Sequence, residues 1–235
     1  MKAHQKIIRD KKAGIVDSLF PPPTNISIKN SMVKRIDFCT ARPIILEYEW
    51  LGTMPLPKSC RYIYGIYFDG VLGGAIIYVH PSTRQFEELY PRQAVQLNRG
   101  ACVSWTPKNT ASRLIAESLH DLRKNGIKII IAYCTKEAGE YGTIYQALGW
   151  WYVGETSPSK TYWLDNHWIS ERTLADKTKW AKDRDEFFIN KFKTLQTKQL
   201  QGKFKYVKLL GNKYENNVIE NTFGYKSLPY PKRDN

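Results

Sequence analysis

The chain of 235 residues is long enough for one large domain, or for one domain with an appended arm. Its hydrophobic content of 42% and aromatic content of 13% are those of a folded protein with a full core. It contains no run of about 18 uncharged apolar residues, and its basic N-terminus lacks an apolar segment, so we expect neither a membrane span nor a secretory signal. The four cysteines form no CxxC pair, and no histidine has metal-ligand spacing. We therefore expect reduced thiols, no preformed metal site and a cytoplasmic location.

The net charge of +14 is unevenly distributed along the chain. Residues 1–43 carry nine lysines and arginines against three acidic residues, residues 44–165 carry twelve against eleven, and residues 166–235 carry fifteen against eight. We therefore expect a basic N-terminal lead-in, a nearly neutral core and a basic C-terminal extension packed on that core. Basic flanks indicate a polyanionic partner. Solvated basic tails without a partner are the alternative.

Two strands joined by a tight turn are predicted in the first half of the core. A helical or extended segment over 44–56 precedes alternating apolar runs over 61–68 and 71–79. The dipeptide Asp69-Gly70 between them is a strong hairpin signal.

An alternation of strands and helices follows the hairpin. A third strand is predicted over 94–105, and it breaks at Thr106-Pro107. An amphipathic helix then opens at Asn109 or Thr110, followed by a buried strand over 127–133, a short helix ending near Gly149 and another strand. This order is typical of an α/β fold.

The C-terminal third has a different pattern. Residues 170–199 are rich in charged residues with spaced aromatic anchors and predict a helix. Residues 203–210 alternate lysine with apolar residues, which predicts a half-buried strand with one cationic face.

The start of the helix near Asn109 is a candidate anion site. Unpaired backbone N–H groups over 108–112 and the positive end of the helix dipole favour a pyrophosphate, and Lys108 and Arg113 add positive charge. An ordinary Asn or Thr N-cap is the alternative.

Several motifs together carry a resemblance to a known family. They are PKNTASRLI (107–115), AGEYGTIYQA (138–147), the Trp-x-x-x-Gly at 150–154 and PYPK (229–232), with the weaker EYEWLGTMP (47–55). The order of elements resembles the acyl-CoA half of the GNAT acyltransferase superfamily. In detail the motifs are similar to the Mom family of phage DNA modification proteins.

The resemblance implies a GNAT-like mixed central sheet flanked by helices, with acetyl-CoA or another acyl-CoA as cofactor. In GNAT enzymes the strand before the phosphate loop runs beside the pantetheine arm, which here places that arm along Ala101 to Trp105. The cofactor-binding residues that it implies are Val103, Trp105, Lys108, Asn109, Thr110, Ala111, Ser112 and Arg113.

The resemblance also implies catalytic residues. Tyr145 stands where GNAT enzymes often place a tyrosine that protonates the departing thiolate, although it could equally pack on the sheet as a core aromatic; Tyr141 is less suited. Glu47 or Glu49 could accept a proton from the attacking amine. Many Mom relatives carry a His-Tyr pair where this chain has Glu49-Trp50, and a surface helix is the alternative reading of this segment.

For the Mom family the implied reaction is transfer of a small acyl or carbamoylmethyl-type group to the N6 amino group of adenine in DNA, which protects phage DNA from restriction. The protein would then be located in the cytoplasm of the host cell. The target adenine would have to leave the duplex before its amino group could react. The implied DNA-binding residues are Trp50, Arg99, Lys203, Lys205 and Lys208. The sequence leaves the oligomeric state open, a homodimer included.

Two other functions are compatible with the same sequence. A GNAT N-acetyltransferase acting on a protein, a tRNA or a small amine would keep the acyl-CoA site without duplex affinity. A non-catalytic nucleic-acid-binding module would retain only the fold.

Overall fold

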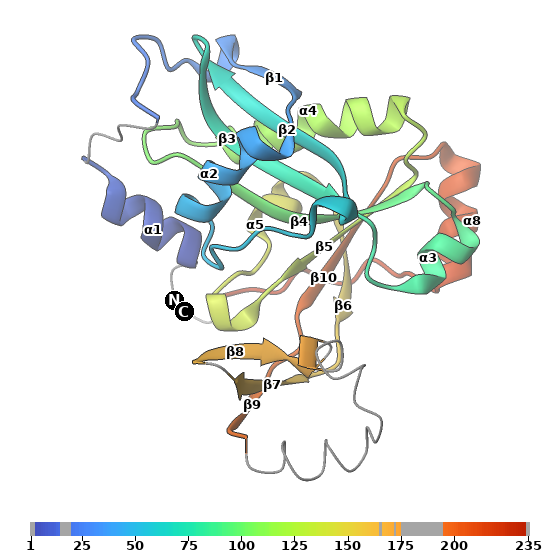
Figure 1. Ribbon diagram of the computed structural model, residues 1–235. Helices are drawn as coiled ribbons and strands as arrows, with labels where there is room; N and C mark the ends of the chain where they lie inside the picture. The colour runs from blue at the N-terminus through green and yellow to red at the C-terminus, as the bar shows by residue number, and fades with distance from the viewer. Residues whose placement is uncertain (1–2, 15–19, 165, 172, 175–194, 234–235) are drawn as a thin grey trace. The chain divides into compact units, whose positions relative to one another are not determined.

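The computed structural model describes residues 3–14, 20–164, 166–171, 173–174 and 195–233 (Figure 1). The chain divides into two compact units. The larger unit combines Met1–Gly154 with Phe204–Asn235, and the smaller one is Glu155–Lys203.

A seven-stranded sheet forms the centre of the larger unit. In spatial order its strands are β1 (Met32–Arg35), β2 (Cys60–Phe68), β3 (Val71–Val79), β4 (Ala94–Cys102), β5 (Ile129–Cys134), β10 (Phe204–Leu209) and β6 (Trp151–Glu155). Strands β4 and β5 are parallel, whereas β1–β2, β2–β3, β3–β4 and β5–β10 are antiparallel. The mixed central sheet predicted from the sequence is confirmed.

The hairpin of β2 and β3 forms as predicted. Asp69 and Gly70 connect the strands with φ angles of 45° and 81°, both in the left-handed region. A turn with positive φ at both central residues matches the twist of the flanking strands, which explains the choice of Asp-Gly.

Helices cover both faces of the sheet (Figure 1). On one face lie α4 (Thr110–Lys124) and α5 (Thr143–Ala147), and on the other lie α2 (Phe38–Tyr48), α3 (Arg84–Leu89) and α8 (Lys213–Phe223). Successive residues of β3 show the division, because Ile76 packs with the α4 cluster and Ile77 with the α2 cluster. Further helical segments include α1 (His4–Lys12) and the short turns Ile28–Asn30, Pro57–Ser59 and Lys136–Ala138.

The smaller unit contains a three-stranded antiparallel sheet in the order β8 (His167–Ser170), β7 (Ser159–Leu164) and β9 (Thr197–Leu200). The helix predicted over 170–199 is wrong at its C-terminal end, where Thr197–Leu200 is a strand, whereas Glu171, Thr173 and Leu174, directly after β8, are helical as predicted. Its middle, 175–194, lies outside the described residues.

The units have other boundaries than the three segments suggested by charge. The boundary expected between residues 43 and 44 falls inside α2, and β1 already belongs to the large sheet. The expected C-terminal extension contributes β10 to the interior of that sheet and β8 and β9 to the smaller unit. Charge density reports which residues face solvent or partners, whereas strand pairing decides these boundaries.

All four cysteines are free, as predicted, and Cys102 and Cys134 are buried. Among the described residues, no helix combines the length and apolarity needed to cross a bilayer. The described part of the chain also contains no group of three or more His, Cys, Asp or Glu side chains suited to a metal ion.

Candidate active site

The central sheet separates between its two parallel strands. Strand β4 pairs with β5 only from Ala94, opposite Ile129, to Leu97, opposite Ala132. Beyond this point β4 continues along β3 to Cys102, while β5 continues along β10. No described strand pairs with the β5-facing edge of residues 98–102. The Asn98 carbonyl accepts from the Arg99 guanidinium. On this edge the backbone N–H and C=O groups of residues 99–102 have no strand partner among the described residues and are available to another partner.

The start of α4 follows directly after this free edge. Asn109 has a φ of 72° and its side chain makes no capping hydrogen bond, while the Thr110 hydroxyl donates to the Pro107 carbonyl at 2.7 Å. In the described part of the chain, the N–H groups of Ala111 and Ser112 have no acceptor. The alternative of an ordinary side-chain N-cap is therefore wrong, and the helix start presents free donors.

Positive side chains flank these donors. Lys108 is exposed, and Arg113 is exposed with its guanidinium 3.4 Å from the carboxylate of Glu117. Free N–H groups, the helix dipole and two cations together form a site suited to a phosphate or pyrophosphate.

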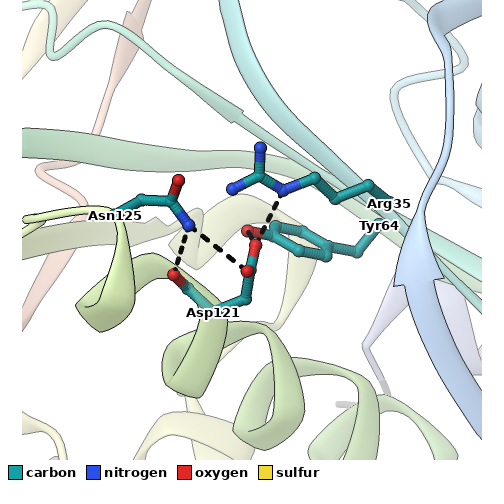
Figure 2. A network of polar contacts seen from close by, with 4 residues as sticks. All are labelled: Arg35, Tyr64, Asp121 and Asn125. Carbon is teal, nitrogen blue, oxygen red and sulfur yellow. Dashed lines mark hydrogen bonds and ion pairs between the residues drawn. The ribbon is translucent and has the colours of Figure 1, made fainter.

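A polar network fixes the C-terminal half of α4 to the sheet (Figure 2). One carboxylate oxygen of Asp121 accepts from the Arg35 Nε and the Tyr64 hydroxyl, each at 2.7 Å, and the other accepts from the Asn125 amide at 3.2 Å. Burial raises the pKa of Asp121, but these hydrogen bonds outweigh it and the net shift is downward. The network joins β1, β2 and α4 and so orients the start of α4 relative to the sheet.

A second, buried contact supports the same helix. The Tyr78 hydroxyl on β3 lies 2.7 Å from the Ser118 hydroxyl, which itself donates to the Ile115 carbonyl at 2.7 Å. Helix α4 is thus held at two points one turn apart.

The strand expected to line a cofactor ends earlier than predicted, at Cys102 rather than Trp105. Val103 is fully buried and donates its N–H to the Gly73 carbonyl at 2.8 Å. The indole N–H of Trp105 donates to the Phe20 carbonyl at 2.7 Å, and its ring lies edge-on to Phe68. Both residues therefore hold the turn into α4, and the free edge lies before them.

Tyr145 lies on α5, on the same face of the sheet as α4. The centroid of its ring lies 4.9 Å from that of the Trp150 ring and 5.4 Å from that of the Tyr206 ring. Burial raises the pKa of Tyr145 well above its usual value, and the nearby Cys134 adds to the shift. Its hydroxyl has no hydrogen-bond partner among the described residues. The structure thus presents a neutral phenol with an unused donor.

The position of α5 depends on a glycine and on the C-terminal PYPK segment. Gly142 has a φ of 68°, and a Cβ there would overlap the Tyr206 ring. The Gln146 amide donates to the Tyr206 hydroxyl at 3.0 Å and, more weakly, to the Pro231 carbonyl at 3.4 Å. The Tyr230 hydroxyl donates to the Trp150 carbonyl at 2.9 Å. Two motifs that lie more than 80 residues apart therefore contact each other, a pairing for which the sequence carries no signal.

Glu49 and Arg99 are brought together on the opposite face of the sheet, next to α2. Glu49 is buried, and one of its carboxylate oxygens accepts from the Leu51 N–H at 2.9 Å. Burial raises the pKa of Glu49, and the charge of Arg99 partly opposes this shift. The Arg99 guanidinium donates to the carbonyls of Thr53 at 2.9 Å and Asn98 at 2.8 Å. The pair thus lies beside the first residues of the free β4 edge.

Helix α1 covers the neighbouring residues Glu47 and Trp50. The exposed Glu47 forms an ion pair with Lys12, and the Trp50 ring stacks on His4 with 5.7 Å between centroids. Arg9 donates to the Thr106 carbonyl at 3.0 Å, in the turn before α4. Glu47 therefore differs sharply from the buried Glu49. The contacts of α1 were not foreseen, because no pattern in a short basic helix specifies its partner.

The cationic face predicted for β10 is wrong. Strand β10 lies inside the sheet, so its alternating side chains enter both covered faces. The Lys205 ammonium lies 4.9 Å from the Tyr225 ring, whereas the Lys208 ammonium donates to the carbonyls of Leu148 at 3.0 Å and Gly149 at 3.2 Å. Burial lowers the pKa of both lysines. Of the three lysines predicted to contact DNA, only Lys203 is exposed.

A comparison with known proteins identifies the family. The sequence model of the Mom protein family matches residues 30–232, which is most of the chain. The chain belongs to the Mom protein family. The match runs from before β1 to the PYPK segment and leaves out α1. It confirms the family predicted from the motifs. No curated protein matches the sequence.

Solved structures with a similar fold include acetyltransferases. An N-acetyltransferase from Staphylococcus aureus Mu50 has 11% identity and a TM-score of 0.45, covering 77% of this chain and 99% of its own. The Salmonella typhimurium protein yncA, described as an acetyltransferase and solved with its cofactor acetyl-CoA, has 10% identity and a TM-score of 0.48, covering 78% of this chain and 95% of its own.

Proposed function

We propose that this Mom family protein is an acyl-CoA-dependent transferase that moves the acyl group of the thioester to the N6 amino group of adenine in DNA, which forms an N6 amide and releases the CoA thiol. Membership of the Mom family supports the reaction and the substrate. The main structural support for this site is the separation of β4 from β5. The free N–H groups at the start of α4 follow this separation, Glu49 and Arg99 lie on one face of the sheet, and Tyr145 lies on the other.

The residues present fit an acyl-CoA. The N–H groups of Ala111 and Ser112, with Lys108 and Arg113, would hold the pyrophosphate. The free backbone groups of residues 99–102 would pair with the pantetheine amides. When bound, the cofactor supplies its acyl group as a thioester.

Tyr145 is the proposed general acid. A thiolate leaving group has a pKa near 8–9, and a neutral phenol with a free hydroxyl can donate a proton to it. Because burial raises the pKa of Tyr145, its hydroxyl stays protonated at neutral pH. The same burial makes its position depend on the packing of α5 against Tyr206.

Glu49 is the proposed base for the attacking amine. The adenine amino group is a poor nucleophile, since its lone pair is delocalised into the ring, so removal of a proton assists the attack. The upward shift brings the pKa of Glu49 closer to neutrality, where a base is most effective. Arg99 lies close enough to act electrostatically on Glu49 and would keep its carboxylate ionised at the working pH.

DNA is the proposed substrate because the chain carries a net charge of +14 and belongs to the Mom family. Binding to phosphates should therefore weaken strongly as salt is raised. The target base has to leave the duplex before its amino group can react, at a cost of a few kcal/mol. Trp50 and Lys203 remain the proposed contacts to base and backbone.

Mass spectrometry of DNA nucleosides tests the proposal. DNA from cells that express the wild-type chain should contain a deoxyadenosine of increased mass, and DNA from cells that express a Glu49→Gln, Tyr145→Phe double variant should not. A normal adenine profile together with acetyl-CoA binding in calorimetry would instead indicate a transferase with another acceptor. A normal profile without such binding would indicate a non-catalytic module.

A further inference from the structure

The three-stranded sheet of the smaller unit has two faces of opposite character. On one face Tyr162, Leu164 and Ile169 pack with Leu174 and Leu195 in a small apolar cluster. Because side chains alternate along a strand, the residues between them point to the other face. That other face has no such cluster among the described residues.

Two tryptophans stand side by side on this second face. Trp163 of β7 and Trp168 of β8 are directly opposite each other in the strand register, with ring centroids 5.3 Å apart and ring planes at 65°. They are 37% and 43% exposed, respectively. Tryptophan is usually largely buried, so a paired and exposed set is unusual.

Polar side chains continue the face beside the tryptophans. Thr161, two residues before Trp163, is directly opposite Lys198 of β9, which is exposed. The N–H of Trp163 donates to the carbonyl of Gln196, which is also exposed. The face therefore combines two large aromatic rings with a cation and hydrogen-bonding groups.

We propose that this face, formed by Trp163, Trp168, Thr161 and Lys198, binds unpaired nucleotides of DNA. Exposed aromatic rings on an open sheet stack on nucleobases, while a neighbouring lysine contacts the phosphate backbone. The bases of an intact duplex are stacked on one another, so only unpaired bases reach these rings. The choice of DNA as the polymer rests on the proposed function, and the strong positive charge of the chain is complementary to it.

A purely structural role makes a different prediction. Cross-strand aromatic pairs stabilise antiparallel sheets, and in that case the rings would not distinguish between ligands. Two DNA strands of equal charge separate the two roles. One is a fluorescein-labelled 12-nucleotide oligodeoxyadenylate, and the other is the same backbone with abasic sites in place of the bases.

Fluorescence anisotropy with the full-length protein measures the two affinities. The wild-type chain should bind the oligodeoxyadenylate at least about tenfold more tightly than the abasic strand, since each stacked base adds appreciable affinity. Trp163→Ala and Trp168→Ala should each remove about tenfold of that preference without changing affinity for the abasic strand. Lys198→Glu should weaken binding of both strands equally.

Two further variants control for folding and for aromatic residues in general. Trp163→Phe keeps a ring and should retain most of the preference even if Trp163→Ala lowers the melting temperature. Tyr214→Ala removes an aromatic residue of α8 that is 77% exposed, and it should leave both affinities unchanged. Equal binding of the two strands by the wild type, or an unchanged preference in both folded tryptophan variants, would overturn the proposal.

The outcome is distinguishable from failure of the proposed function. Modified deoxyadenosine in cells, with no base preference in anisotropy, would reject the stacking face and leave the function standing. A tryptophan-dependent base preference without modified deoxyadenosine would support the face and reject the function.

Discussion

The two faces of the central sheet differ in the ionisable side chains that they hold. On the α2 face, the buried Glu49 and the half-buried Arg99 carry opposite charges and influence each other's pKa. On the α4 and α5 face, the buried ionisable groups include Cys134, Tyr78 and Tyr145, and burial raises the pKa of all three. One face thus offers a proton acceptor beside a cation, and the other offers a neutral proton donor.

The separation of β4 from β5 would let one bound molecule reach the groups on both faces of the sheet. A continuous sheet would isolate the donor from the acceptor, because paired strands leave no passage between the two faces. Here the backbone of residues 99–102 is unpaired toward β5, next to the start of α4. A thioester held along that edge would have Tyr145 on one side and Glu49 on the other. Each prediction below alters one side of this arrangement and leaves the other intact.

Replacing the proposed acid should have the largest effect. Tyr145→Phe removes one oxygen from a buried ring and should lower kcat by about 10²- to 10⁴-fold, the range typical of a general acid. Affinity for DNA should be unchanged. The control is Tyr141→Phe, which alters a neighbouring and only partly buried ring. Equal activity of the two variants in a nucleoside mass assay would remove Tyr145 from the acid role.

Replacing the proposed base should have the next largest effect. Glu49→Gln keeps the shape of the side chain and should lower kcat by about 10²-fold, whereas Glu47→Gln removes only an exposed ion pair with Lys12 and should change little. If the two variants lose activity equally, the buried carboxylate has no special role.

The pH dependence of the reaction follows from the same carboxylate. Protonated Glu49 cannot accept a proton, so kcat/KM should fall as pH is lowered through its pKa. Because that pKa is raised by burial, the acid limb should lie above the value of about 4.3 found for ordinary glutamate. An acid limb at or below that value, measured in the wild type, would contradict the role.

A glycine pair tests how α5 is held. Gly142 and Gly126 both have positive φ, at 68° and 79°, but only at Gly142 would a Cβ meet another side chain, that of Tyr206. Both alanine variants should lose about 1 kcal/mol from backbone strain. Gly142→Ala should lose about 1–3 kcal/mol more, from overpacking. Urea unfolding measures the free energy of unfolding of the two variants. Equal midpoints would show that the Tyr206 ring moves aside without a cost in stability.

The smallest effect is expected at the network that anchors α4. Asp121→Asn should lower the free energy of unfolding by about 1 kcal/mol at pH 7, because its partners are partly exposed. The pKa of Asp121 is lowered in the folded state, so its contribution is present above the unfolded value of about 3.9 and is lost as pH falls through the folded value. The variant and wild type should therefore converge in acid, and a constant difference would point to packing instead.

The parts predicted correctly from the sequence depend on local patterns. The Asp69-Gly70 turn, the amphipathic period of α4 and the apolar run of β5 each specify their own structure within a few residues. Glu49 and Arg99 were identified separately, but their proximity depends on α2 packing against β4.

The parts predicted wrongly depend on long-range pairing. Strand β10 reads as a surface strand because its lysines alternate with apolar residues. It enters the sheet interior because Phe204 to Leu209 pair with Cys134 to Ile129, which lie between 70 (Phe204 and Cys134) and 80 (Leu209 and Ile129) residues earlier in the chain. There Lys208 donates hydrogen bonds to backbone carbonyls, and Lys205 lies over an aromatic ring. No local sequence pattern distinguishes these buried lysines from lysines that bind phosphate. The early end of β4, by contrast, has a local cause, because the chain turns after Val103, whose carbonyl accepts from both the N–H and the hydroxyl of Thr106.

The most direct test of the account uses purified protein, plasmid DNA and acetyl-CoA with a carbon-13-labelled acetyl group. After digestion of the DNA to nucleosides, mass spectrometry follows the label. The account predicts label in a modified deoxyadenosine, abolished by Tyr145→Phe and retained by Tyr141→Phe. Unlabelled deoxyadenosine, with the label left in acetyl-CoA or transferred to protein or a free amine, would contradict it.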